Sequence, residues 1–169
     1  MPNEQTAAEI AHGRAVREMF SGIAGKYDLL NHLLSINIDK RWRRLVRGKL
    51  EDVLANPGAV ILDVACGTGD LSIELASHAK ARVIGSDFCR PMLTIAKEKT
   101  SASTLPIPYL ESDAMKMPFA DSSFDAVTIA FGLRNLSNFR DGLIALTSTV
   151  FPSLDRRSSG SVKSSWPGP

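Results

Sequence analysis

The chain has 169 residues, of which 44% are hydrophobic and 22% charged, and this describes one ordinary folded domain rather than a disordered or fibrous chain. Two cysteines far apart in the chain exclude a disulfide framework, and three histidines without ligand spacing give no support for a metal site. The formal net charge of +2 says little about partners, and we expect no nucleic acid among them.

The sequence also argues against a membrane-spanning or exported protein. Its uncharged apolar runs stay far below the ~20 residues that a spanning helix needs. Residues 1–5 resemble neither the start of a secretory signal nor an arginine-rich transit segment. We therefore expect a cytoplasmic protein, and peripheral contact with the inner face of the membrane stays open.

Residues 1–56 are helical in pattern, with helices predicted from about 13–34 and 39–54 and a break around 35–37. The second helix is basic and amphipathic. Its stripe consists of Trp42, Leu45, Val46, Lys49, Leu50 and Val53, and its other faces carry Lys40, Arg41, Arg43, Arg44 and Arg47. Two interpretations stay open: the helix rests against anionic headgroups, or, as is more common, it packs on the sheet with a solvated charged face.

Residues 60–70, with the sequence VILDVACGTGD, are the most informative segment of the chain. They predict a strand over 60–64, a loop with Gly67 and Gly69, and a helix from Leu71. The two glycines allow backbone angles and a close approach of ligand that a Cβ would forbid. Such a loop places backbone amides directly against a small ligand.

The residues around this loop indicate which ligand it takes. Ser72 stands where a dinucleotide fingerprint has its third glycine, and Asp63 and Asp70 flank the loop. Because a carboxylate repels a pyrophosphate, the ligand is expected to be cationic at this end. S-adenosylmethionine fits, since it carries an ammonium and a sulfonium but no phosphate.

Two further predicted strands end in acids. The strand 82–87 ends in Asp87, where ribose hydroxyls are usually bound, and the strand 108–112 leads to Asp113 and Ala114, which suit an adenine amino group. The alternative is that these acids only cap the helices that follow, as in any doubly wound α/β protein. Three acids at three successive strand ends favour S-adenosylmethionine.

Three sets of residues carry a resemblance to one family. They are the N-terminal pattern Met19-Phe20, Ile23-Ala24, Tyr27-Asp28, Asn31, Leu34-Ser35, Asp39 and Trp42-Arg43, the segment 62–70, and the motif Phe131-Gly132-Leu133-Arg134-Asn135-Leu136. The chain resembles the ubiquinone/menaquinone biosynthesis C-methyltransferases over about residues 14–150. Asn37 departs from the pattern, because the family usually has glycine there.

The resemblance implies a fold and an activity. The fold is the Rossmann-like, doubly wound α/β sheet of S-adenosylmethionine-dependent methyltransferases, with strand order 3-2-1-4-5-7-6, in which residues 57–150 bind the cofactor and 1–56 form N-terminal helices. The activity is methyl transfer to a ring carbon of a polyprenyl quinol. Conversion of demethylmenaquinol to menaquinol is favoured, and the alternative substrate is a 2-polyprenyl-6-methoxybenzoquinol.

The resemblance and the residues together predict the site. Cofactor binding is expected from Asp63, Gly67, Thr68, Gly69, Asp87, Asp113, Ala114 and Ala130. For catalysis, Arg134 would steady a developing quinolate oxygen, Asn135 would orient the ring, and Tyr27, with Asp28, would close the pocket. The alternatives are that Arg134 only fixes its loop by a salt bridge and that Tyr27 is a packing aromatic.

The last segment departs from the family. Residues 151–169 are rich in serine and proline without a period, so we expect a disordered, non-native tail and a sheet incomplete after its fourth strand. Codons for residues 156–162 can read Gly-Gly-Arg-Leu-Val-Leu in a shifted frame, as the family continues, so we hypothesise a frameshift. The exposed fourth strand, 124–131, would then favour self-association. An inactive cofactor-binding fragment is therefore the remaining alternative.

Overall fold

A parallel sheet of four strands, in the order β3-β2-β1-β4, lies at the centre of the protein. The structure is a computed structural model that describes residues 6–35, 38–103, 105–130, 132, 136 and 138–150. The strands are β1 (Val60–Val64), β2 (Arg82–Asp87), β3 (Tyr109–Glu111) and β4 (Ala126–Ile129). The spatial order is the one expected for the first four strands, and β4 is an edge of the sheet within the described residues.

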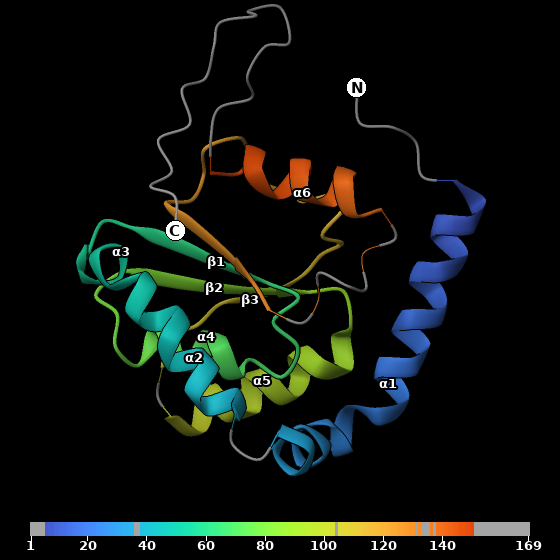
Figure 1. Ribbon diagram of the computed structural model, residues 1–169, viewed down its shortest axis with the longest axis horizontal. Coiled ribbons are helices and arrows are strands. Elements are labelled where there is room, and N and C mark those ends of the chain that lie inside the picture. Colours follow the sequence, from blue (N-terminus) through green and yellow to red (C-terminus); the bar gives the residue numbers. More distant parts are fainter. Residues whose placement is uncertain are drawn as a thin grey trace, which may run out of the picture.

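Helices cover both faces of this sheet, which confirms the doubly wound α/β class (Figure 1). They are α1 (Ala7–Ser35), α2 (Ile38–Lys49), α3 (Glu51–Ala55), α4 (Asp70–Ala76), α5 (Arg90–Ser103) and α6 (Phe139–Ser148). Helices α2, α4 and α5 lie on one face and α6 on the other, while α1 stands beyond the ends to which the strand arrows point. Within the described ranges, no helix combines the length and the apolar character needed to cross a bilayer.

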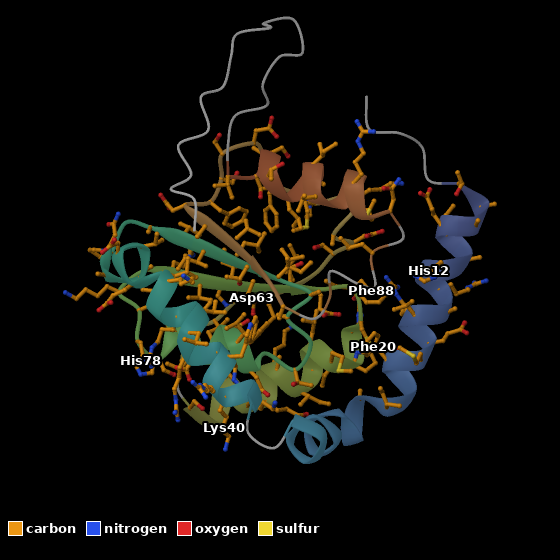
Figure 2. All side chains as sticks on the ribbon, viewed as in Figure 1. His12, Phe20, Lys40, Asp63, His78 and Phe88 are labelled. Atoms are coloured by element: carbon orange, nitrogen blue, oxygen red, sulfur yellow. The ribbon has the colours of Figure 1, made fainter. Side chains whose placement is uncertain are left out.

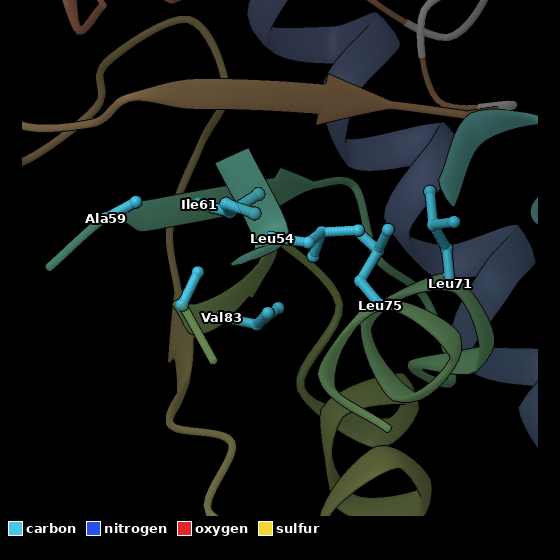
Figure 3. Close-up of a cluster of buried hydrophobic side chains, with 7 residues drawn as sticks. Leu54, Ala59, Ile61, Leu71, Leu75 and Val83 are labelled. Atoms are coloured by element: carbon cyan, nitrogen blue, oxygen red, sulfur yellow. The ribbon is translucent and has the colours of Figure 1, made fainter. Parts of the chain in front are cut away.

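The alternation of side chains along β1 gives the sheet two apolar faces. Ile61 packs on one face with a cluster from α3, α4 and β2, drawn in Figure 3. Leu62 and Val64 pack on the other face with Phe124 and with Leu146 of α6. Because both faces of β1 are buried, its sequence is a nearly continuous apolar run, which is the pattern of a central parallel strand.

The predicted strand limits are confirmed for β1 and β2 and were too wide for the other two. β3 covers three residues of the predicted 108–112, and β4 pairs with β1 only from Ala126 to Ile129. Just before β4, Asp125 is bound to the start of β1 twice: its backbone amide donates to the Val60 carbonyl at 2.9 Å, and its carboxylate accepts the amide hydrogen of Val60 at 2.8 Å. Self-association through β4 stays a prediction.

The N-terminal helices differ from the prediction at their ends. Helix α1 begins at Ala7, earlier than predicted, because Thr6 and Glu9 form a capping box in which each residue's side chain accepts the other's backbone amide hydrogen (2.7 and 3.3 Å). The predicted helix 39–54 is divided at Leu50 into α2 and α3. The predicted break includes Asn37, which lies outside the described residues.

Helix α2 packs on the sheet layer, as the more common interpretation expected. Trp42, Val46 and Leu50 contact the cluster around Ile61. Leu45 and Lys49 were wrongly assigned to this stripe: both are exposed, Leu45 at 61%. Each lies one residue, or about 100° of helical turn, from a residue that packs on the core. The exposed face that contains Leu45 is therefore a separate feature of the helix.

A first prediction concerns Gly85 in β2. A Cβ on this residue would lie 2.5–2.6 Å from ring carbons of Tyr109, its partner in β3, so Gly85→Ala should lower the free energy of unfolding by about 1–3 kcal/mol. The matched control is Gly48→Ala in α2, where a Cβ meets nothing within 4 Å and should stabilise the helix by up to about 1 kcal/mol. Urea unfolding of both variants checks this, and equal stability of Gly85→Ala and the wild type would contradict it.

Candidate functional site

The predicted site residues meet at the carboxyl ends of the strands. The sheet is parallel, so the loops after β1 and β2 lie together at the carboxyl ends of the strands. The strand order reverses direction at β1, and ligands bind at this point in such sheets. Backbone hydrogen bonds hold these loops together. The Cys66 amide donates to the Ser86 carbonyl at 3.0 Å, and the Ser112 amide donates to the Asp87 carbonyl at 3.1 Å.

The loop after β1 has an unusual backbone. Ala65, Gly67 and Gly69 have φ angles of +52°, +57° and +81°, all in the left-handed region that favours glycine. The loop closes through a hydrogen bond from the Gly69 amide to the Cys66 carbonyl at 2.9 Å. A Cβ built on Gly67 would meet nothing within 4 Å, so this residue leaves open space for a ligand against the backbone.

Gly69 is required by the packing beneath the loop as well as by its left-handed φ, and its contact with cofactor stays a prediction. A Cβ at this position would lie 2.6 Å from the Tyr109 hydroxyl oxygen and 3.0 Å from the Cβ of Ala96. The close approach that needs glycine here is thus made by the protein's own side chains. Tyr109, which the sequence analysis did not select, extends from β3 across Gly85 to the underside of the loop.

Asp63 occupies the buried centre of the site, at the position labelled in Figure 2. Its carboxylate accepts hydrogen bonds from the hydroxyls of Ser72 in α4 at 2.6 Å and Thr128 in β4 at 2.8 Å. Burial raises its pKa to about 6, and these two hydrogen bonds oppose the rise. Asp63 thus joins three elements, and Ser72, which breaks the dinucleotide fingerprint, is explained by this contact. Binding of cofactor by Asp63 itself stays a prediction.

Asp87 connects the end of β2 to the glycine loop. Its two carboxylate oxygens accept the amide hydrogens of Gly67 and Cys89, each at 2.8 Å, and the residue is 6% exposed. Burial raises its pKa. Each oxygen can accept more than one hydrogen bond, so these contacts leave capacity for a ligand hydroxyl.

Asp113 and Ala114 follow β3 as predicted. Asp113 is exposed, and its carboxylate accepts the Met115 amide hydrogen at 2.8 Å, so it closes a tight turn. Ala114 is half-buried beside the cluster around Leu62. The capping alternative therefore describes a real hydrogen bond of Asp87, to the Cys89 amide just before α5. It does not describe Asp63, nor Asp113, because the described residues between β3 and β4 contain no helix.

Thr68 points toward α5. It is 3% exposed, and its hydroxyl accepts a hydrogen bond from the Lys99 ammonium at 3.1 Å. The same ammonium pairs with Asp70 at 2.8 Å, and Arg43 of α2 lies 3.5 Å from the Asp70 carboxylate. Lys99 and Arg43 have no local sequence signal for this role, because both contacts join residues far apart in the chain. Binding of cofactor through the Thr68 side chain stays a prediction.

Helix α1 lies against the ends of β2 and β3. The Arg17 guanidinium is 5.5 Å from the ring centroid of Phe88 and 3.8 Å from the Glu111 carboxylate. Phe20, labelled beside Phe88 in Figure 2, packs with the buried Cys89. This placement agrees with a helix that covers the cofactor end of the sheet. Tyr27 belongs to α1, but its side chain and that of Asp28 lie outside the described residues.

The loop after β4 touches the glycine loop through Gly132. A Cβ on Gly132 would collide with the Cβ of Ala65, so only glycine allows the two loops to lie this close. Ala130, the last predicted cofactor residue, is half-buried and packs on the cluster around Ile61. Arg134 and Asn135 lie outside the described residues, and their roles stay predictions.

The second prediction follows from Asp63. Its pKa of about 6 in the folded chain exceeds the ordinary 3.8, so the stability linked to its protonated form is complete below about pH 4 and is lost as the pH rises through 6. Asp63→Asn removes this loss. The unfolding free energy of the variant minus that of the wild type should rise by up to about 3 kcal/mol between about pH 4 and pH 7.

Urea unfolding across this pH range measures the difference. The control for loss of one negative charge is Asp121→Asn, at an exposed turn before β4. A difference between Asp63→Asn and the wild type that stays constant with pH would contradict the prediction.

Comparison with known proteins shows to which family the chain belongs. A model of the ubiE/COQ5 methyltransferase family matches residues 7–152. The demethylmenaquinone methyltransferase of Deinococcus radiodurans is 45% identical over 141 residues, which make up 83% of this chain and 57% of that protein. The enzyme of the same name from Thermus thermophilus is 47% identical over 135 residues, 79% of this chain and 60% of that protein.

A third relative carries the broader name. The ubiquinone/menaquinone biosynthesis C-methyltransferase UbiE of Geotalea uraniireducens is 42% identical over 139 residues, 78% of this chain and 56% of that protein. The chain therefore spans little more than half the length of these relatives.

Solved structures share the fold. A SAM-dependent methyltransferase from Aquifex aeolicus is 27% identical, with a TM-score of 0.55 over 62% of this chain and 57% of that one. The [4+2]-cyclase SpnF, 24% identical, has a TM-score of 0.60 over 65% of this chain and 42% of that one, and it shows the fold alone. The family model matches most of the chain, including the glycine loop and the three strand-end acids, and the chain belongs to the ubiE/COQ5 methyltransferase family.

Proposed function

We propose that this chain binds S-adenosylmethionine at the carboxyl ends of β1, β2 and β3 and belongs to an enzyme that methylates a polyprenyl quinol. The observation that carries the proposal is Asp87, a buried carboxylate hydrogen-bonded to the amide of Gly67 in the glycine loop. It puts an acceptor for hydroxyl groups beside a backbone that a ligand can approach closely. S-adenosylmethionine is the cofactor that family membership implies.

The residues present fit this cofactor. Carboxylates of Asp87 and Asp113 at successive strand ends suit neutral or positive groups and disfavour a pyrophosphate. Asp87 would accept hydrogen bonds from ribose hydroxyls, and Asp113 with Ala114 would contact the adenine. Gly67 leaves the backbone open at the centre of the loop. When bound, the cofactor supplies an electrophilic methyl group on a sulfonium.

The substrate we propose is demethylmenaquinol, with a ring carbon as the methyl acceptor. The names of the Deinococcus and Thermus relatives support this choice over a benzoquinol. Arg134 would hold a quinolate oxygen by its permanent charge, and Asn135 would orient the ring. Since the reaction needs the ring carbon in line with the methyl group, positioning by these residues and by Tyr27 would supply most of the rate.

The third prediction tests cofactor binding. Calorimetric titration of the chain with S-adenosylmethionine should give saturable binding. Asp87→Asn should bind about tenfold or more weakly, because an amide replaces one of the two acceptor oxygens. Asp121→Asn, which removes the same charge at an exposed turn, should bind as the wild type does.

Circular dichroism accompanies each titration, because Asp87 also holds the glycine loop. A folded wild type that does not bind would overturn the proposed cofactor site. Full affinity in folded Asp87→Asn would overturn the role of Asp87 alone.

The fourth prediction concerns methyl transfer from S-adenosylmethionine to the quinol. With labelled S-adenosylmethionine and a short-chain demethylmenaquinol, Arg134→Gln should lower kcat by about a hundredfold or more while cofactor affinity is unchanged. The control is Arg140→Gln, on the exposed side of α6. Transfer only to a methoxybenzoquinol would replace the substrate we propose. Cofactor binding without transfer to either quinol would identify the chain as an inactive cofactor-binding fragment.

A further inference from the structure

The outer face of α2 is a cationic surface that takes no part in the described packing of the helix on the core. We define the α2 face as Lys40, Arg41, Arg44, Leu45 and Lys49, all exposed, with Leu45 61% exposed. Arg41 and Lys49 lie one turn on either side of Leu45 along the helix. Among the described residues, no ion pair involves any of the four cations of this face.

The other cations of the helix have structural partners, which separates the two groups. Arg43 pairs with Asp70 at 3.5 Å and Arg47 with Glu74 at 2.9 Å, so both residues fasten α2 to α4. The apolar stripe of Trp42 and Val46 is taken up by the core. The charges of the α2 face are therefore not needed to hold the helix in place.

The position of this face relates it to the site. Arg43 reaches Asp70, the residue that directly follows the glycine loop, so the amino-terminal part of α2 lies beside the cofactor end of the sheet. Glu51 and Asp52 begin α3 and limit the positive charge to α2. A surface that binds the α2 face would thus lie next to the proposed site.

We propose that the α2 face docks the protein on an anionic lipid surface, with its four cations at the headgroups and Leu45 inserted among them. The partner fits by charge complementarity, since each lysine or arginine near an anionic bilayer strengthens binding and an exposed leucine gains by leaving water. The choice of a membrane also rests on the proposed function, because a polyprenyl quinol dissolves in a bilayer. An exposed aliphatic residue amid the charges fits a bilayer better than a nucleic-acid backbone.

The test is co-sedimentation of the chain with vesicles of phosphatidylglycerol and phosphatidylcholine, compared with phosphatidylcholine alone. The wild type should bind only the anionic vesicles, and more weakly as salt increases. The triple variant Arg41→Gln, Arg44→Gln and Lys49→Gln should lose about fivefold in partitioning per residue, or about a hundredfold together. Leu45→Ser should lose about tenfold and keep the salt dependence.

A matched control removes the same charge elsewhere. The control is a second triple variant, Lys80→Gln, Arg82→Gln and Lys97→Gln, at exposed residues. They surround a hollow of about 920 Å³ at the amino ends of β2 and β3, away from the carboxyl ends where the proposed site lies. This variant should bind anionic vesicles nearly as the wild type does. Equal losses in the two triple variants would reduce the effect to net charge and overturn the proposal.

Two further measurements distinguish membrane docking from the proposed cofactor site and from binding to nucleic acid. Titration with S-adenosylmethionine on the same samples reports the cofactor site, so absent vesicle binding with intact cofactor binding overturns the docking proposal alone. Fluorescence anisotropy with a labelled DNA duplex tests the other anionic partner. Loss of duplex binding in the α2 variant, without any change in vesicle binding, would also overturn it.

Discussion

The hydrogen bond from the Gly67 amide to Asp87 is the contact on which the arrangement of the site depends. It holds the loop after β1 against the end of β2, and the bond from Cys66 to the Ser86 carbonyl fixes the same two segments one residue earlier. The Asp87 carboxylate is therefore both the group proposed to bind the ligand and the group that holds the glycine loop in position. Burial raises the pKa of Asp87 and the backbone donors oppose that rise, so a ligand hydroxyl bound there would donate to oxygens that already accept hydrogen bonds from the loop.

Helices α1 and α2 support this arrangement from outside the sheet. Helix α1 reaches Glu111 at the end of β3 through Arg17, and α2 reaches Asp70 after the glycine loop through Arg43. Both contacts join a helix to a residue beside a strand end. Such partly exposed ion pairs contribute little to stability individually, so their main effect is to fix where the helices lie. Residues before β1 are thus part of the site's architecture rather than an appendage to it.

The sequence predicted those elements whose limits are set by residues close together in the chain. The apolar run of β1, in which Asp63 stands next to last, and the segment of β2, which ends in Asp87, predicted both strands to the residue. Thr6 with Glu9 carried a capping signal that would have placed the start of α1. Contacts between distant segments could not be predicted in this way. The ring of Tyr109 beneath Gly69 depends on how β3 and the loop pack, and nothing near either residue in the sequence records that contact.

The buried contact between Asp63 and Ser72 has an evolutionary consequence. Glycine at position 72, as in the dinucleotide fingerprint, would leave a buried carboxylate with the hydroxyl of Thr128 as its remaining donor among the contacts described above. Replacing Asp63 first would instead leave the Ser72 hydroxyl without its acceptor. Either change alone costs stability that the second change partly restores, so the two positions are epistatic. A lineage that exchanged one class of nucleotide ligand for another in this fold would have had to alter both residues within a short interval, or cross a less stable intermediate.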